Sequence, residues 1–93
     1  MYLHVGNQKN IRVRSIIGIF DMDTSTVSPI TRAFLSNAQK GTGMESASND
    51  ELPKSFVVYE GRFGKNKVCL SQLSTSALSG RLDETENIGK IED

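Results

Sequence analysis

The stretch Ser-Phe-Val-Val-Tyr-Glu-Gly-Arg-Phe-Gly-Lys-Asn-Lys-Val-Cys-Leu, residues 55–70, decides the fold of this chain. Residues 55–60 are rich in β-branched and aromatic side chains, which favour a strand. Residues 61–66 contain two glycines and an asparagine, the composition of a turn, and residues 67–70 return as a second strand. The stretch therefore predicts a β-hairpin.

A second hairpin and a longer strand are predicted nearer the N-terminus. Apolar residues alternate with polar ones over residues 2–5, and a polar turn over residues 6–10 leads to a short strand at 11–13. Residues 16–20, Ile-Ile-Gly-Ile-Phe, form an apolar run that is typical of a central strand. Residues 21–28 are polar and predict a turn.

The main helix is predicted by its two ends. Ser28 can cap the N-terminus with Pro29 in the first turn, and Lys40-Gly41 is a typical C-terminus. We expect the apolar residues between these ends to face the core, namely Ile30, Ala33, Phe34 and Ala38. A second, short helix is predicted from Ser74 or Thr75 to Leu82.

Together these segments predict an α+β fold: a small antiparallel sheet of two hairpins and a central strand, with one main helix and a short C-terminal helix. One domain is expected over residues 1–82, with a mobile loop at 41–52, where apolar side chains are scarce. Residues 83–93 are strongly acidic and are expected to be disordered.

Composition narrows the class of protein. The chain has 93 residues and one cysteine, Cys69, so it can form no internal disulfide, and a reducing cytoplasm is favoured. The longest apolar run, residues 16–20, is far too short to span a membrane. The net charge of zero conceals a split, because residues 1–82 carry ten Lys and Arg against six Asp and Glu. A basic body with an acidic tail is therefore expected.

Motifs for catalysis, cofactors and metals are weak. Asp21-Met22-Asp23-Thr24 after an apolar strand is similar to the nucleophile loop of haloacid-dehalogenase-type phosphatases. That chemistry needs further groups on a parallel sheet, so we expect both aspartates simply to end a strand and open a turn. Residues 61–66 lack the spacing of a phosphate-binding loop, and His4 has no partner histidine for a zinc site. No enzyme activity, cofactor or metal is predicted.

The basic residues are the candidate functional groups. Arg12 and Arg14 are expected to share one face of an extended segment. Solvated charge explains such residues in a single copy, but repetition in an oligomer would create a phosphate-binding surface. The candidate DNA-binding residues are Arg14, Lys54, Arg12, Arg32, Arg62, Lys65 and Lys67.

Five short segments, in this order, resemble the RemA/RemB family, small bacterial regulators of biofilm extracellular-matrix genes. The segments span about residues 1–82: Tyr-Leu-His-Val-Gly at 2–6, Arg-Ser-Ile-Ile-Gly-Ile-Phe-Asp at 14–21, Ser-Pro-Ile at 28–30 with Lys-Gly at 40–41, Pro-Lys-Ser-Phe-Val-Val at 53–58, and Leu-Ser followed by Leu-Ser-Thr-Ser-Ala-Leu and Arg-Leu between 70 and 82. The first segment, the Gly-Ile-Phe-Asp strand end and Pro-Lys-Ser are closest to the RemB branch.

The resemblance implies a DNA-binding transcription regulator that assembles into a homo-oligomeric ring with double-stranded DNA against its basic surface. Arg14 is retained as RemB-like members have it. The arginine cluster that the RemA branch carries before the second hairpin is reduced here to Lys54. The alternative is a regulatory or interaction subunit that does not bind DNA and that partners a more basic paralogue.

Overall fold

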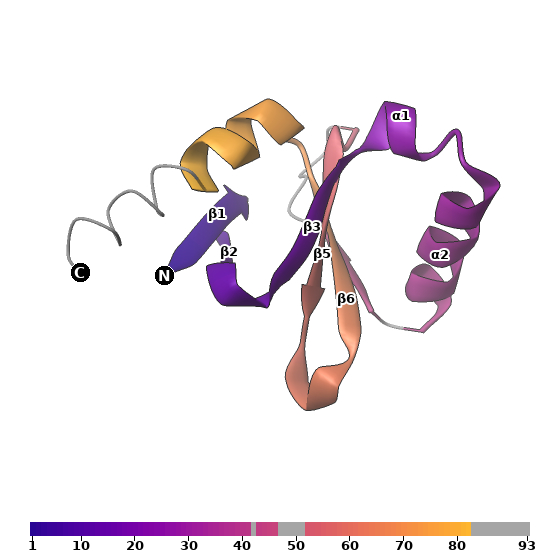
Figure 1. The fold of residues 1–93 in the computed structure, drawn as a ribbon, viewed down its shortest axis with the longest axis horizontal. Coiled ribbons are helices and arrows are strands. Elements are labelled where there is room, and N and C mark those ends of the chain that lie inside the picture. The colour runs from indigo at the N-terminus through magenta and orange to yellow at the C-terminus, as the bar shows by residue number, and fades with distance from the viewer. Residues whose placement is uncertain (42, 47–51, 83–93) are drawn as a thin grey trace.

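The structure of the chain is a computed structural model that describes residues 1–41, 43–46 and 52–82 (Figure 1). It is an α+β fold with two sheets. A two-stranded sheet pairs β1 (Tyr2–Gly6) with β2 (Lys9–Arg12), and a four-stranded sheet has the order β3 (Ile16–Asp21), β5 (Ser55–Glu60), β6 (Asn66–Ser71), β4 (Met44–Ser46). The predicted fold class is confirmed, although the strands are divided between two sheets.

The hairpin of β5 and β6 forms the centre of the larger sheet, as its sequence predicts. Its antiparallel register runs without a break from Ser55 opposite Ser71 to Glu60 opposite Asn66. A single 3-10 turn, η2 (Arg62–Gly64), joins the strands. All residues of β5 except Glu60 are buried, so this strand contributes to the core on both of its faces.

The two faces of the larger sheet carry separate cores. On one face Val57, Tyr59 and Cys69 pack against β1, β2 and Leu78. On the other face, Leu35 of α2 (Pro29–Lys40) packs against three strand residues, Phe56, Val58 and Val68. Figure 1 accordingly shows the small sheet and the last helix on one side of the hairpin and α2 on the other.

The strand β3 lies at an edge of the sheet, so its predicted central position is wrong. It pairs with β5 alone, because β6 and then β4 occupy the other side of β5. Its apolar residues therefore divide between two environments. Ile16 and Ile19 pack against the core that contains Val57, whereas Ile17 and Phe20 are 60% and 40% exposed.

The segment predicted as a loop over residues 41–52 contains a strand. Residues 44–46 form β4, which pairs in parallel with β6 over Met44 to Ser46. The backbone N–H of Val68 also donates to the carbonyl of Gly43. Met44 reaches the core beside α2, and Glu45 is held by contacts from other strands, so tertiary partners override a polar local sequence. Residues 42 and 47–51 of the predicted mobile loop, and residues 83–93 with their predicted disorder, lie outside the described residues.

The helix α2 has the predicted ends but not the predicted core face. The hydroxyl of Ser28 accepts from the backbone N–H of Thr31, and the helix ends at Lys40. Leu35 is its buried residue, with Ala38 beside it. Ala33 is exposed, Phe34 is 38% exposed and Ile30 is 82% exposed, because α2 packs over the β6 and β4 side of the sheet and leaves the β3 side uncovered.

The two aspartates after β3 have a local structural role. The carboxylate of Asp21 accepts from the backbone N–H groups of Asp23 and Thr24 at 2.7 and 3.1 Å. It thereby caps α1 (Met22–Ser25), a single helical turn that the polar sequence did not indicate. The prediction that these residues end a strand and open a turn is confirmed.

The predicted second helix is present over residues 75–82 and packs beside the small sheet. The hydroxyl of Ser74 accepts from the N–H of Ala77 at its start. Leu78 is fully buried in the core that contains Leu3 and Val5. The N-terminal hairpin and this helix therefore form one layer, although they come from opposite ends of the described chain.

A buried hydroxyl ties this layer to the larger sheet, and its removal should be costly. Ser71 is fully buried, donates to the carbonyl of Val5 at 2.7 Å and accepts from the N–H of Leu73 at 3.0 Å. We expect Ser71→Ala to lower the free energy of unfolding by about 1–3 kcal/mol, since the carbonyl of Val5 loses a buried hydrogen bond and the N–H of Leu73 a partly buried one. Urea denaturation measures the change. The exposed Ser36→Ala is the control, and an equal effect of both substitutions would contradict the assignment.

Candidate nucleic-acid interface

Two of the predicted basic residues line one shallow cleft. Arg12 ends β2, and Arg62 follows β5 in the hairpin turn. Both lie at a cavity of about 380 Å³ whose other walls are Asn10, Ile11, Ser15, Tyr59, Glu60 and Gly61. This basic cleft therefore lies between the small sheet and the Tyr59 end of β5.

Arg14 lies next to this cleft but does not share a strand face with Arg12. Residues Val13–Ser15 form a 3-10 turn, η1, instead of the extended segment that was predicted. That prediction is wrong because the chain must bend here to pass from the small sheet to β3. Arg14 is exposed, and Ile16 after it pairs with Tyr59, which places Arg14 at the same end of the larger sheet as the basic cleft.

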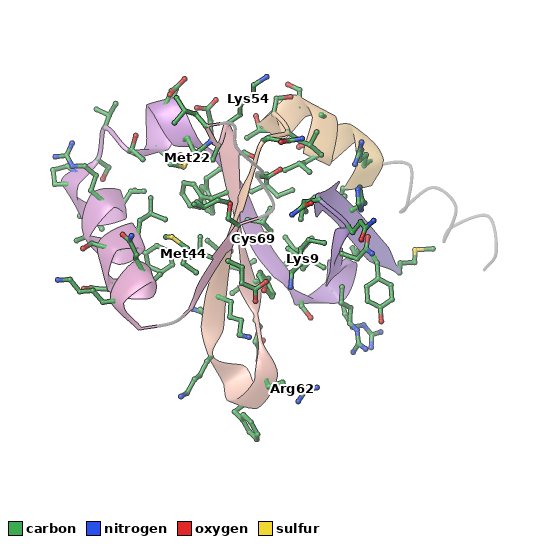
Figure 2. The ribbon with its side chains drawn as sticks, turned by 180° about the vertical axis from the view of Figure 1, so that it is seen from behind. Lys9, Met22, Met44, Lys54, Arg62 and Cys69 are labelled. Atoms are coloured by element: carbon green, nitrogen blue, oxygen red, sulfur yellow. The ribbon has the colours of Figure 1, made fainter. Side chains whose placement is uncertain are left out.

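Lys54 lies at the opposite end of that sheet. Its backbone N–H donates to Ser71 and its carbonyl accepts from Met22, while its side chain is exposed. The six residues of β5 separate it from the hairpin turn, a span of about 20 Å. Figure 2 shows Lys54 and Arg62 at opposite ends of the hairpin. One protomer therefore does not bring Lys54 and Arg62 together.

The other three predicted residues have separate surroundings. Arg32 donates from Nη1 to the carbonyl of Thr26 and lines a different cavity, beside α2. Lys65 is exposed at the hairpin turn. Lys67 lies 3.9 Å from Glu45, so part of its charge is offset by a carboxylate. The residues that the structure gathers at one end are thus Arg12, Arg14 and Arg62, with Lys65 at the tip.

An ionic cluster that the sequence did not indicate joins the two sheets. Lys9 of β2 lies 2.5 Å from a carboxylate oxygen of Glu45 in β4, and the Tyr59 hydroxyl donates to the other oxygen at 3.1 Å. The Lys9 ammonium is also 5.9 Å from the centre of the Tyr59 ring. Only a prediction of β4 could have found this cluster, because β4 is the strand that brings Glu45 to Tyr59.

The cluster shifts the ionisation of its members. The hydrogen bond from Lys9 lowers the pKa of Glu45, and the same bond raises the pKa of Lys9. Burial of the phenol, followed in size by the nearby Glu45 charge, raises the pKa of Tyr59. All three shifts follow from packing at a sheet junction, so we assign the cluster to stability.

The remaining candidate groups have ordinary structural roles. His4 is exposed, and its Nδ1 lies 3.2 Å from Oδ1 of Asn10, its cross-strand neighbour, as predicted. Cys69 is fully buried in the core. Among residues 1–41, 43–46 and 52–82, no three His, Cys, Asp or Glu side chains are placed to hold a metal ion. No helix in these ranges is long and apolar enough to cross a membrane.

Comparison with models of known protein families and with curated proteins found no match. The resemblance to the RemA/RemB family is therefore carried by the short segments alone.

The Glu45 cluster should make stability depend on pH in two windows. The lowered pKa of Glu45 gives stability that is present above pH 4.5 and is lost as the pH falls through the folded-state pKa. The raised pKa of Lys9 gives stability that is present below pH 10.5 and is lost as the pH rises through its folded-state value. In urea unfolding measured across pH, we expect Glu45→Gln to remove the acid window and to shrink the alkaline one, where burial still raises the pKa of Tyr59. The exposed Glu60→Gln should keep them, and equal pH profiles for the parent and Glu45→Gln would contradict the assignment.

Proposed function

We propose that this chain is a DNA-binding regulator of transcription that acts as a homo-oligomeric ring and presents one basic cleft per subunit. The observation that carries the proposal is the gathering of Arg12, Arg14 and Arg62 at one end of the larger sheet from three separate elements. None of these three side chains has a hydrogen bond or ion pair within the described ranges. No group in the described part of the chain therefore competes with an external anion for these charges.

Arginine at an exposed cleft suits phosphate in particular. A guanidinium presents a planar fork of N–H donors that matches two phosphate oxygens, and it stays charged at any physiological pH. Glu60 is the one carboxylate among the described residues that line the cleft, so the local balance is positive. Three cations on one protomer bind DNA weakly, but phosphate contacts add along the backbone when the cleft is repeated.

The regulatory part of the proposal comes from the resemblance to the RemA/RemB family. We assign the chain to the control of biofilm-matrix genes on that ground, with double-stranded DNA and further copies of itself as partners. The cytoplasm is the proposed location, since the single thiol, Cys69, needs no oxidising compartment. Lys54 keeps the position of the RemA arginine cluster, at the far end of the sheet from the basic cleft.

A second candidate function is a regulatory subunit that binds a paralogous protein instead of DNA. The observation that favours it is an exposed apolar surface beside β3, where Ile17 and Ile30 are 60% and 82% exposed. The same surface would also serve contacts between identical copies. Binding of DNA by the purified protein alone decides between the two candidates.

Substitution of the arginines at this end of the sheet should weaken DNA binding without regard to sequence. We expect Arg12→Ala and Arg14→Ala each to lower affinity for every duplex and to reduce the slope of log K against log salt by about 0.9 for each phosphate that the variant no longer neutralises. Fluorescence anisotropy over a salt titration measures both quantities. The control is Lys40→Ala, which removes an exposed charge from the end of α2.

Lys54→Ala belongs in the same series, because it reports whether DNA also reaches the other end of the sheet. Affinities and salt slopes of Arg12→Ala and Arg14→Ala that equal those of the parent would remove the basic cleft from the DNA-binding surface. Absence of DNA binding by the parent at low salt would favour the paralogue-binding subunit.

The proposed ring sets a lower limit on the mass of the protein in solution. Light scattering on the chain without DNA should give a mass above that of a tetramer, since neighbouring copies would pair the edge strand β3 and cover the apolar surface beside it. A stable monomer of 10.2 kDa at micromolar concentration would contradict the ring.

A further inference from the structure

An apolar groove runs between β3 and α2. Its floor is formed by Phe56 and Val58 of β5, and its walls by Ile17, Phe20, Ile30 and Phe34. The cavity has a volume of about 360 Å³, and its remaining lining residues are Thr31 and Asn66. The groove exists because α2 packs over β6 and β4 and leaves the β3 side of the sheet uncovered.

One wall of the groove packs against its floor, but no described residue covers the groove. The rings of Phe20 and Phe56 stack with centroids 5.2 Å apart, which holds one wall against the floor. Ile30 nevertheless leaves 82% of its surface exposed, and Phe34 leaves 38%. A contiguous apolar surface of this kind marks a site of protein contact.

The same chain carries an apolar side chain that projects into water. Phe63 stands at the tip of the β5–β6 hairpin and is 96% exposed. Its backbone has φ +63°, and Gly64 after it has φ +71°. A bulky residue rarely occupies the left-handed region, so this turn presents Phe63 outward at some conformational cost.

We propose that Phe63 of one copy of the chain inserts into the apolar groove of a second copy. The ring of Phe63 is small enough for the groove, since a cavity of about 150 Å³ already accommodates a benzene ring and the groove is larger. The charges agree at one end of the groove, whereas Asn66 at the other end lies between Lys65 and Lys67. Lys65 flanks Phe63 at the hairpin turn, and Asp21 and Asp23 follow Phe20 at one end of the groove. Lys54 lies near that end and offsets part of this attraction, so apolar burial dominates the contact.

Since Phe63 and the groove are different surfaces, the contact is heterologous. Each copy that donates Phe63 still has an open groove, and each copy that accepts still has a free Phe63. Association then continues from copy to copy until the arrangement closes into a ring. The inference deepens the proposed function, because it supplies the contact on which the repeated basic cleft rests.

The proposed contact and the basic cleft use different side chains. Arg62 lines that cleft and Phe63 does not, although the two residues are adjacent in the hairpin turn. Assembly and DNA binding then use different residues and can be tested apart.

Two substitutions, one on each surface, test the contact without disturbing the fold. Phe63→Asn suits the left-handed backbone better than phenylalanine does. Ile30→Glu places an acidic residue in the first turn of α2, where the helix dipole favours it. Light scattering without DNA should show each variant as a monomer of 10.2 kDa. Tyr2→Ser removes another exposed aromatic residue, on β1, and should assemble as the parent does.

The two variants should complement each other. Phe63→Asn retains an intact groove and Ile30→Glu retains Phe63, so an equimolar mixture should form a dimer with twice the monomer mass and no larger species. A Phe63→Asn variant that assembles like the parent would overturn the proposed contact. So would a mixture that stays monomeric at concentrations where the parent assembles.

The design separates this inference from the proposed function. A parent that assembles, and loses assembly in both variants, but does not bind DNA supports the contact and overturns DNA binding. A parent that binds DNA while Phe63→Asn keeps its full mass overturns only the contact. A parent that is itself monomeric overturns the contact and the ring together.

Discussion

The pairing of β5 with β6 is the interaction on which the rest of the structure depends. Its strands alternate side chains between two cores, so Val57 and Cys69 face the small sheet while Phe56 and Val68 face α2. Among the described residues, neither outer layer forms a core without side chains from the hairpin. Each layer is stable only because the hairpin gives it an apolar face to cover, and this suits a chain in which one small core would bury too little surface.

The outer layers cover that hairpin incompletely. Both surfaces that we propose to be functional lie where this cover ends. On one face α2 shields β6 and β4 but not β3, which leaves the apolar groove. On the other face the small sheet meets β5 near Tyr59, and the bend between them leaves the basic cleft. Both sites therefore arise at boundaries between layers, where packing is incomplete, and neither interrupts the core.

Local sequence patterns were sufficient where local chemistry decides the structure. They predicted the hairpin of residues 55–70, the capped start of α2 at Ser28 and the helix over residues 75–82. They failed where contacts with distant residues decide the structure. The polar sequence of β4 forms a strand because it pairs with β6 and because Glu45 is bound by side chains of other strands. Helical spacing alone likewise could not show which flank of α2 meets the sheet, and it therefore assigned Ile30 to the core. The basic residues were identifiable by type, but their grouping depends on the 3-10 bend that follows Arg12.

The union of β1, β2 and the helix at 75–82 in one layer has a consequence for the order of folding. Leu3 and Leu78 meet in the same core, so that core cannot close until nearly all of the described chain has been synthesised. The core against α2 draws on residues 22–70 and can form earlier. Contacts of such long sequence separation slow folding. The nascent chain thus spends part of its synthesis with the N-terminal hairpin exposed, and the last helix completes its burial.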